Sequence, residues 1–445
     1  MDSLQNLRLN TGIASSLFDI HKKKGPDYWS FEGNSKRNGA HSLISYPAMM
    51  VPSLQGHLID IISKEVTVNH ILDPFVGSGT ILTEAMSRNI EFTGIDINPL
   101  AILACRVKST CYFVAALKIK HESLCKRINA SNQKGCRKFP GVEKWFHTQT
   151  AKELETISRA IRKETSLWAR RVFWLAMGRT VRQVSNSRLS TYKLHKRSTQ
   201  ELGLYRCAID EFAKQCKSVI KSINEQHLSL KHAQLIERGR YTGVTNTFIG
   251  DAKTILAKES RSFDLIMTSP PYGDNQTTIP YGQFSYLPLH WIDLKDIDPG
   301  LDESLIQNTH YIDSQSLGGS MRHSLDKSEY LAEYYKSTRP IIEKLRSKPN
   351  GLKRFATFFF DLQETVIKLC ESTSNGGCHS WTVGNRQINN QIVPMNEILI
   401  EVLDYNGLRT IATIDRQIKN KKMAPRNNIA NTMNDETIVI AQKRV

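Results

Sequence analysis

The sequence predicts an α/β protein whose doubly wound, mostly parallel sheet is interrupted by a large helical insertion. Strand-like apolar runs alternate with helical patterns over residues 41–110, and the alternation resumes after residue 245. Between these stretches, residues 111–245 lose the strand pattern and adopt helical spacing. In each α/β stretch, a short motif of unusual composition directly follows a strand-like run.

The first α/β stretch opens with an apolar run at residues 68–72 (VNHIL), which predicts a buried strand ending at Asp73. Residues 1–40, which precede this stretch, are polar and basic and are predicted to form an N-terminal arm. After Asp73 we expect a glycine-rich turn, a helix (ILTEAMSRN), a strand (EFTGI) ending at Asp96, and a helix beginning at Asn98-Pro99, where proline suits the first turn.

The second α/β stretch, residues 246–445, is predicted to complete a discontinuous catalytic domain with residues 41–110. It begins with strand-like segments at 247–251 (TFIGD) and 263–267 (FDLIM). The glycine- and aspartate-rich residues 293–325 predict a mobile loop. Next we expect helices around 328–346 and 354–373, a strand (HSWTVGN), a helix (NEILIEVLDYNG), a strand (LRTIATI), a basic loop (KNKKMAPRNN) and a last strand (ETIVIAQK).

Length and composition indicate a globular protein of two or three lobes. A chain of 445 residues exceeds the usual size of a single core. The N-terminus lacks the pattern of a signal peptide and no apolar run approaches the length of a membrane span, so we expect a cytoplasmic protein that does not enter membranes. The eight cysteines include no CxxC pair or zinc spacing, which predicts reduced thiols and no metal.

The positive charge of the chain is concentrated in one segment. Residues 111–245 hold 27 Lys and Arg against 10 Asp and Glu, so this segment carries the whole net charge of +17. A solvated helical face is the ordinary explanation of a charged run. An excess of this size repels itself unless a polyanion offsets it, which favours a nucleic acid as partner.

The turn behind the first strand, Asp73-Pro74-Phe75-Val76-Gly77-Ser78-Gly79-Thr80, predicts a ligand site. Gly77 and Gly79 let backbone approach a ligand closely. The missing GxxxxGK[ST] lysine disfavours a triphosphate, and the incomplete GxGxxG disfavours a dinucleotide. At the next strand end, Asp96 can accept both hydroxyls of a ribose, and Asp251 at a later strand end can accept from an adenine amine. These carboxylates favour an adenosine ligand with a cationic group.

The second motif, Thr268-Ser269-Pro270-Pro271-Tyr272, directly follows the FDLIM run. Pro270 and Pro271 fix φ and remove two N–H groups, so the loop offers mainly acceptors in a rigid frame. Acceptors suit an exocyclic amine, and Tyr272 provides a ring on which an extruded base can stack. An isolated Pro-Pro-Tyr turn would be structural or a partner's ligand, but its place behind a buried strand favours a base site.

These motifs resemble those of the DNA amino-methyltransferases, which use S-adenosylmethionine to methylate cytosine N4 or adenine N6. DPFVGSGT is similar to their donor-binding motif and TSPPY to their catalytic motif. Tyr46-Pro47-Ala48-Met49-Met50-Val51-Pro52 resembles the segment that covers the methionine end of the donor. The resemblance implies a Rossmann-like methyltransferase sheet. It covers residues 40–110 and 247–290, and 354–445 by pattern alone.

The resemblance also implies roles for individual residues. Asp73, Pro74, Phe75, Gly77, Gly79 and Thr80 would line the donor pocket with Tyr46 and Pro47, Asp96 would hold the ribose, and Asp251 the adenine. Ser269, Pro270, Pro271 and Tyr272 would form the base site. Serine at the first position of the catalytic motif leans toward cytosine N4, whereas aspartate or asparagine leans toward adenine N6. No Pro-Cys pair is present, and carbon-5 methylation would need a cysteine nucleophile.

Double-stranded DNA is therefore the expected partner, in a restriction–modification or defence system. Whether a cognate restriction endonuclease accompanies the chain is left open. The basic insertion, residues 111–245, is the candidate for DNA recognition, although residues 293–350 could share that role. Within the insertion, residues 185–188 (SNSR) and 192–197 (YKLHKR) combine groups suited to phosphates and bases. The alternatives are a tRNA or rRNA amino-methyltransferase and a non-enzymatic binding protein with a vestigial donor site.

Overall fold

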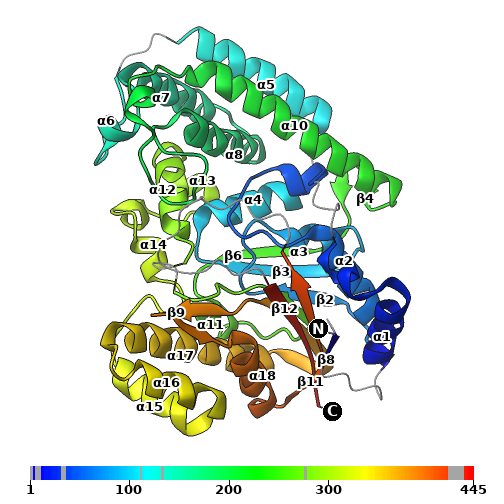
Figure 1. The fold of residues 1–445 in the computed structure, drawn as a ribbon. Helices are drawn as coiled ribbons and strands as arrows, with labels where there is room; N and C mark the ends of the chain where they lie inside the picture. The colour runs from blue at the N-terminus through cyan, green and yellow to red at the C-terminus, as the bar shows by residue number, and fades with distance from the viewer. Residues whose placement is uncertain are drawn as a thin grey trace.

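The computed structural model of the chain describes residues 4–5, 12–31, 37–110, 113–131, 135–274, 278–418 and 435–444 (Figure 1). Its centre is an eight-stranded sheet in the order β1-β11-β12-β8-β7-β2-β3-β6. The strands of this sheet are β1 (Leu4–Gln5), β2 (His70–Asp73), β3 (Glu91–Asp96), β6 (Thr245–Ile249), β7 (Phe263–Thr268), β8 (Thr373–Val383), β11 (Leu408–Gln417) and β12 (Asp435–Lys443).

The sheet is doubly wound around β2. From β6 to β8 neighbouring strands are parallel, whereas β12 runs antiparallel to both β8 and β11. The chain adds β3 and β6 on one side of β2, and β7 and β8 on the other side. The carboxyl ends of β2 and β7 therefore flank a topological switch point, where ligands bind in sheets of this kind.

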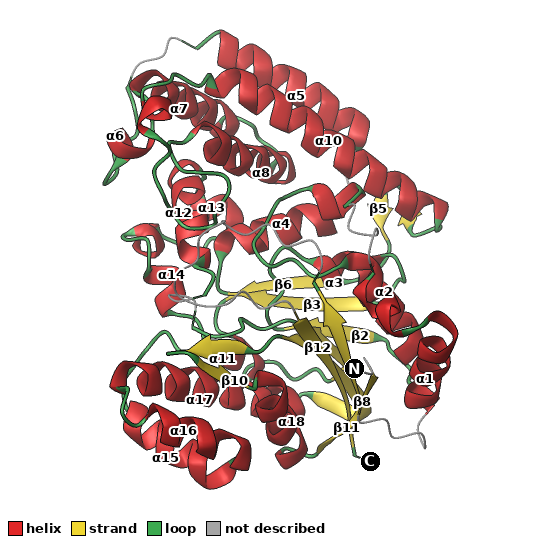
Figure 2. Ribbon diagram, in the orientation of Figure 1, coloured by secondary structure: helices red, strands yellow, loops and turns green. Residues whose placement is uncertain are grey.

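Helices cover both faces of the sheet (Figure 2), because successive residues of the buried strands point to opposite sides. In β2, Ile71 packs into one hydrophobic cluster and Leu72 into another, and Leu265 and Ile266 of β7 divide in the same way. The first cluster contains residues of α1 (Gly12–Lys24), α2 (Pro52–Ile62), α3 (Thr80–Met86) and α4 (Pro99–Ser109); the second contains residues of α11 (Ala252–Leu256), α15 (Ser324–Tyr334), α16 (Arg339–Leu345), α17 (Pro349–Glu371) and α18 (Met395–Tyr405).

The predicted fold class is confirmed, and each predicted strand of the central sheet lies within one or two residues of an observed strand or inside a longer one. The single helix predicted around 328–346 is wrong. The chain extends at Tyr335, passes through a 3₁₀ turn (η4, Lys336–Thr338) and restarts as α16, with Pro340 in its first turn. The basic loop predicted at 419–428 lies outside the described residues.

A helical lobe stands at one edge of the sheet, at the top of Figure 1. We define it as residues 114–232, and it contains α5 (Val114–Asn129), α6 (Val142–Trp145), α7 (Thr148–Arg162), α8 (Leu167–Val184), α9 (Thr199–Leu202) and α10 (Ala208–His232). The short hairpin β4 (Ile236–Glu237) and β5 (Arg240–Tyr241) leads from α10 back to β6, and a second hairpin, β9 (Arg386–Ile388) and β10 (Gln391–Val393), follows β8.

The stretch predicted as a mobile loop at 293–325 contains three short helical turns and packs on this lobe. It contains α13 (Leu294–Ile297), η3 (Glu303–Ile306) and α14 (Tyr311–Ser314), and it follows α12 (Tyr281–Trp291). Ile297, Ile306 and Ile312 are buried in the hydrophobic cluster of the lobe, which anchors this polar stretch. Pattern reasoning missed it because the apolar residues are few and widely spaced.

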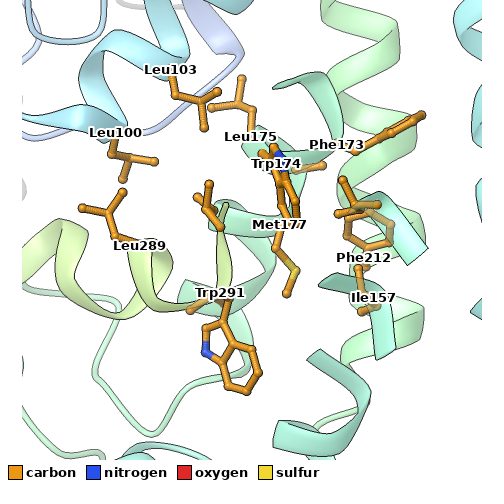
Figure 3. Close-up of a cluster of buried hydrophobic side chains, with 14 of the residues drawn as sticks. Leu100, Leu103, Ile157, Phe173, Trp174, Leu175, Met177, Phe212, Leu289 and Trp291 are labelled. Carbon is orange, nitrogen blue, oxygen red and sulfur yellow. The ribbon is translucent and has the colours of Figure 1, made fainter. Parts of the chain in front are cut away.

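The helical lobe shares its core with α4 and α12 of the sheet domain (Figure 3). Leu100 and Leu103 of α4 face Leu175 of α8, and Leu289 and Trp291 of α12 close the cluster from the other side. The lobe is thus not a separate unit on a linker, because removing it would expose a fully buried face of α4.

Asp296 of α13 joins the lobe to the sheet domain by polar contacts. Its carboxylate accepts two bonds of 2.7 Å from Arg170, and a third of 2.7 Å from the indole N–H of Trp174. Burial opposes ionisation of Asp296, but the bonds from Arg170 and Trp174 outweigh it and hold the pKa below its usual value. Asp293 and Glu303 pair with Arg162 and Arg137, so acids outside the insertion offset part of its charge.

Among the described residues, no helix is long and apolar enough to span a membrane, and no group of three or more His, Cys, Asp or Glu side chains could hold a metal ion.

We predict that Asp296→Ala lowers the free energy of unfolding by about 3–5 kcal/mol, because it leaves Arg170 and Trp174 without their carboxylate partner in a largely buried site. Glu303→Ala is the matched control: it removes an acid of which 76% of the side chain is exposed, and should cost less than about 1 kcal/mol. Urea unfolding measures both. The lowered pKa of Asp296 means that its stabilisation is lost only below about pH 4. Equal losses would contradict the prediction.

Candidate functional site

One pocket joins the two sequence motifs at the switch point of the sheet. We call residues 73–80 the donor turn and residues 269–272 the acceptor loop. The empty volume of the pocket, counted out to its open mouth, is about 990 Å³, which suits a small molecule. The predicted site residues that line it are Tyr46, Pro47, Pro74, Phe75, Gly77, Thr80, Asp96, Asp251, Ser269 and Pro271. Asp73, Gly79, Pro270 and Tyr272 lie behind this lining.

Asp73 fastens the donor turn to the acceptor loop. Its carboxylate is fully buried at the end of β2, where one oxygen accepts from the Phe75 N–H at 3.1 Å and from the Thr268 hydroxyl at 2.6 Å. Thr268 ends β7 and directly precedes the acceptor loop. Burial raises the pKa of Asp73 to about 7. The residue is thus a structural tie between the two loops.

Asp96 faces the pocket from the end of β3. One carboxylate oxygen accepts from the Gly77 N–H at 2.8 Å and the other from the Asn98 N–H at 2.8 Å. Gly77 reaches Asp96 with a positive φ of 49°, which favours glycine. Burial raises the pKa of Asp96 to about 6, although these backbone bonds favour the ionised form. Each oxygen keeps a lone pair for a ligand hydroxyl.

The rear of the donor turn rests on α4. The ammonium group of Lys108 is buried and donates to the Gly79 carbonyl at 3.2 Å, and the Cys105 thiol donates to the Gly77 carbonyl at 3.4 Å. Burial lowers the pKa of Lys108 to about 8. Gly79 has a φ of 76°, and a Cβ there would lie 3.0 Å from the Cys105 sulfur. Two side chains of α4 therefore hold the donor turn from behind, through the backbone carbonyls of the turn.

Tyr46 forms one wall of the pocket together with a residue that the sequence motifs did not single out, Asn98. The amide of Asn98 donates to the Tyr46 hydroxyl at 2.9 Å and to the Ser285 hydroxyl at 2.7 Å. Tyr46 stacks on Tyr281 with ring centroids 5.6 Å apart. The Asn98-Pro99 helix start was a signal for Asn98, whereas Tyr281 comes from α12 and carries no local signal.

The opposite wall is formed by residues far apart in sequence. Asp251 is exposed and caps α11 by accepting from the Lys253 N–H at 2.7 Å. The Lys253 ammonium pairs with Glu364 at 2.8 Å. Asp361 of α17 accepts from Lys327 at 2.9 Å. The wall residues that sequence reasoning missed are Lys253, Gln315, Ser316, Leu317, Asp361 and Thr365.

The composition of the pocket fits S-adenosylmethionine. Its charged lining consists of Asp96 and Asp251, and of two side chains that are paired with opposite charges: Asp361 with Lys327, and Lys253 with Glu364. A cationic ligand is favoured in such a lining and a polyphosphate is repelled. Asp96, with an open lone pair on each oxygen, matches a ribose diol.

In the acceptor loop, Ser269 faces the pocket and Tyr272 supports it. The Ser269 hydroxyl donates to the Tyr272 hydroxyl at 3.2 Å, which in turn donates to Glu436 of β12 at 2.9 Å. The Tyr272 ring is partly buried against the hydrophobic cluster beneath the sheet. In this structure the ring is packed rather than presented to the pocket, where the sequence predicted a stacking platform.

The chain is similar in sequence to known DNA methyltransferases. The family model of the N6/N4 DNA methylases matches residues 11–104. The type II methyltransferase M.MvaI of Kocuria varians is 26% identical over 447 residues, covering 96% of this chain and 95% of its own length. The type II methyltransferase M.AvaI of Nostoc sp. is 22% identical over 397 residues, covering 83% of this chain and 79% of its own.

A solved rRNA methyltransferase, aviRa from Streptomyces viridochromogenes, overlays on 93% of this chain and 96% of its own with a TM-score of 0.32 and 9% identity, which is too distant to carry an argument. The family model and a relative aligned over nearly the whole chain nevertheless agree. This protein is therefore similar to the N6/N4 DNA methylases, and methyltransferases of this kind use S-adenosylmethionine as the methyl donor.

Proposed function

We propose that the protein methylates the exocyclic amine of a base in double-stranded DNA, with cytosine N4 favoured over adenine N6. The observation that carries the proposal is the single pocket, in which the carboxylates of the donor side and Ser269 of the acceptor loop share one space. A methyl donor and an amine must lie side by side for in-line transfer, and this pocket holds groups suited to each.

On the donor side, the residues would bind and orient S-adenosylmethionine. Asp96 would accept the ribose hydroxyls, Asp251 the adenine amine, and Tyr46 with Tyr281 would cover the methionine end and exclude water. When bound, S-adenosylmethionine supplies a methyl group on a sulfonium, which is electrophilic enough to need no protein nucleophile. In agreement, no cysteine is among the described residues that line the pocket.

On the acceptor side, Ser269 would accept a hydrogen bond from the target amine and hold its nitrogen toward the donor. The two prolines keep this position rigid because neither has a free φ. Serine at the head of the motif supports cytosine N4, and adenine N6 is the alternative outcome of the test below. The names of the relatives, type II methyltransferases, support a place in a restriction–modification system.

We further propose that DNA lies against the helical lobe near residues 187–196. A single antiparallel bridge between Ser187 and Lys196 closes this segment into a narrow loop. Arg188, Lys196 and Tyr192 are exposed on it, which suits contacts with phosphates and bases. Ser185, Asn186 and Ser187, predicted as contact residues, are buried instead; the Asn186 N–H donates to the Trp145 carbonyl at 2.7 Å. The dense backbone bonding of this segment explains the difference.

Arg182 adds a further cation to the surface proposed for DNA near residues 187–196. Its guanidinium lies 4.0 Å from the centroid of the Phe284 ring, and it has no carboxylate partner among the described residues. Burial lowers its pKa to about 10. Arg182 and Arg188 line a small cleft with Ser187 and Phe284. Two guanidinium groups without a neighbouring acid at this cleft favour an anion, and a DNA phosphate is the natural one.

The proposed reaction is tested by incubating the purified protein with DNA and with RNA in the presence of labelled S-adenosylmethionine, and then analysing the nucleosides by mass spectrometry. We expect N4-methylcytosine in DNA. N6-methyladenine in DNA would keep the enzyme class and overturn the preferred base. Label in RNA alone, or no label in either polymer, would overturn the proposal.

We predict that Ser269→Ala lowers kcat about 100-fold or more, because the amine loses the acceptor that orients it. Binding of S-adenosylhomocysteine, measured by calorimetry, should stay within about twofold of the wild type. Ser78→Ala, which removes a hydroxyl from the donor side of the same pocket, serves as the control and should not lower kcat by a comparable factor. A wild-type kcat in Ser269→Ala would contradict the role.

We predict that donor binding weakens as the pH falls below about 6. The pKa of Asp96 is raised to about 6, so the carboxylate is ionised above that pH and neutral below it. Protonation removes the negative charge that attracts the ribose hydroxyls and the sulfonium. Calorimetry between pH 5 and 8 should show this loss in the wild type. Asp96→Asn should bind weakly at every pH, and an unchanged pH dependence in that variant would contradict the assignment.

We predict that Arg188→Ala weakens DNA binding and lowers the slope of log K against log salt by about 1, because one phosphate contact is lost. Arg444→Ala removes the same charge from the C-terminal end of the sheet, where Arg444 pairs with Asp404, and is the control. Filter binding at several salt concentrations measures both slopes. A slope equal to that of the wild type in Arg188→Ala would place the DNA elsewhere.

A further inference from the structure

Glu436 forms the end of a directed chain of hydrogen bonds that begins in the pocket. The carboxylate is 15% exposed, and its oxygens face two partners. One oxygen accepts from the Tyr272 hydroxyl at 2.9 Å, and the other pairs with Arg416 of β11 at 2.6 Å. The Arg416 guanidinium also donates to the Ser30 carbonyl of the N-terminal arm at 3.3 Å.

The direction of this chain is determined by proton counting. A phenol has one proton, and an ionised carboxylate can only accept, so the Tyr272 proton is committed to Glu436. The contact of 3.2 Å between the two hydroxyls must then use the proton of Ser269. Ser269 therefore has no proton left for a ligand and faces the pocket with lone pairs alone. Burial raises the pKa of Tyr272 well above its usual value, which keeps its proton in place.

We propose that Glu436 is a positioning residue that makes Ser269 an obligate hydrogen-bond acceptor and so selects an amine over a carbonyl at the target position. This inference rests on the proposed function, since it assigns the target to the pocket side of Ser269. A free serine hydroxyl can rotate and donate to a carbonyl as readily as it accepts from an amine. With its proton committed, Ser269 rejects the carbonyl of uracil or hypoxanthine and retains the amine of cytosine or adenine.

Arg416 holds the Glu436 carboxylate in place. It is 8% exposed, and its pairing with Glu436 offsets the cost of burying both charges. Because the ion pair joins β11 and β12, these two antiparallel strands set the orientation of the Ser269 hydroxyl in the pocket. The contact with Ser30 gives the N-terminal arm a place in the same network.

The test uses the full-length protein, kcat and donor KM, and the variants Glu436→Gln, Tyr272→Phe and their combination. Glutamine can donate as well as accept, so the direction of the chain is lost. We expect Glu436→Gln to lower kcat about tenfold with an unchanged KM for S-adenosylmethionine. In the Tyr272→Phe background the same substitution should change kcat less than twofold, because Glu436 acts through Tyr272. Additive losses in the double variant would overturn the inference.

Asp415→Asn is the matched control. Asp415 lies on β11 next to Arg416 and accepts from the Thr437 hydroxyl at 2.6 Å, with no contact to Tyr272. A loss of kcat in this variant equal to that of Glu436→Gln would mean that damage to the strand pair, and not hydroxyl direction, lowers the rate. That result would overturn the inference.

A second readout measures selectivity without turnover. Duplexes that carry cytosine or uracil opposite an abasic site leave the target base unpaired in both, so extrusion costs are similar. The wild type should bind the cytosine duplex about tenfold more tightly, and Glu436→Gln should bind both within about twofold; adenine and hypoxanthine replace them if N6 is the target. Equal discrimination by the two proteins would overturn the inference. Absence of DNA methylation by the wild type would instead overturn the proposed function.

Discussion

The site depends on one hydrogen bond, from the Thr268 hydroxyl to the buried carboxylate of Asp73 at 2.6 Å. It joins the ends of two neighbouring parallel strands at the switch point, and each strand end leads directly into one of the two loops of the pocket. Burying a carboxylate is costly, and the raised pKa of Asp73 reflects that cost. The fold tolerates it because the bond sets the separation of donor turn and acceptor loop, on which any transfer between them depends.

Helix α4 extends this constraint to the helical lobe. Its N-cap, Asn98, lines the pocket; Leu100 and Leu103 enter the core of the lobe; and Lys108 holds the donor turn from behind. The pocket and the surface proposed for DNA therefore share a rigid element. Phe284 makes a second connection, because it packs edge-on against Tyr46 and beneath Arg182.

The sequence sufficed for the strands, the switch point and most of the pocket lining, because those residues sit at strand ends with a recognisable spacing. It did not reveal Asp361, Tyr281 or Glu436, which reach the site from elements far along the chain and have no local pattern. It also misjudged Ser185–Ser187, since a polar run looks exposed until its backbone partners are known. Local composition predicts strand ends well and tertiary hydrogen bonds poorly.

In the insertion, residues 111–245, the positions of the charged side chains matter more than the net charge of the segment. Three acids of α13 and its neighbours pair with Arg137, Arg162 and Arg170, so part of the excess is neutralised at the junction with the sheet domain. The cations left without such partners include Arg182, beside Phe284 at the edge of the pocket wall. Under the proposed function, the positive potential that remains near the pocket would attract a phosphate backbone to the place where the target base leaves the stack. The same net charge spread over the lobe would bind DNA without directing it.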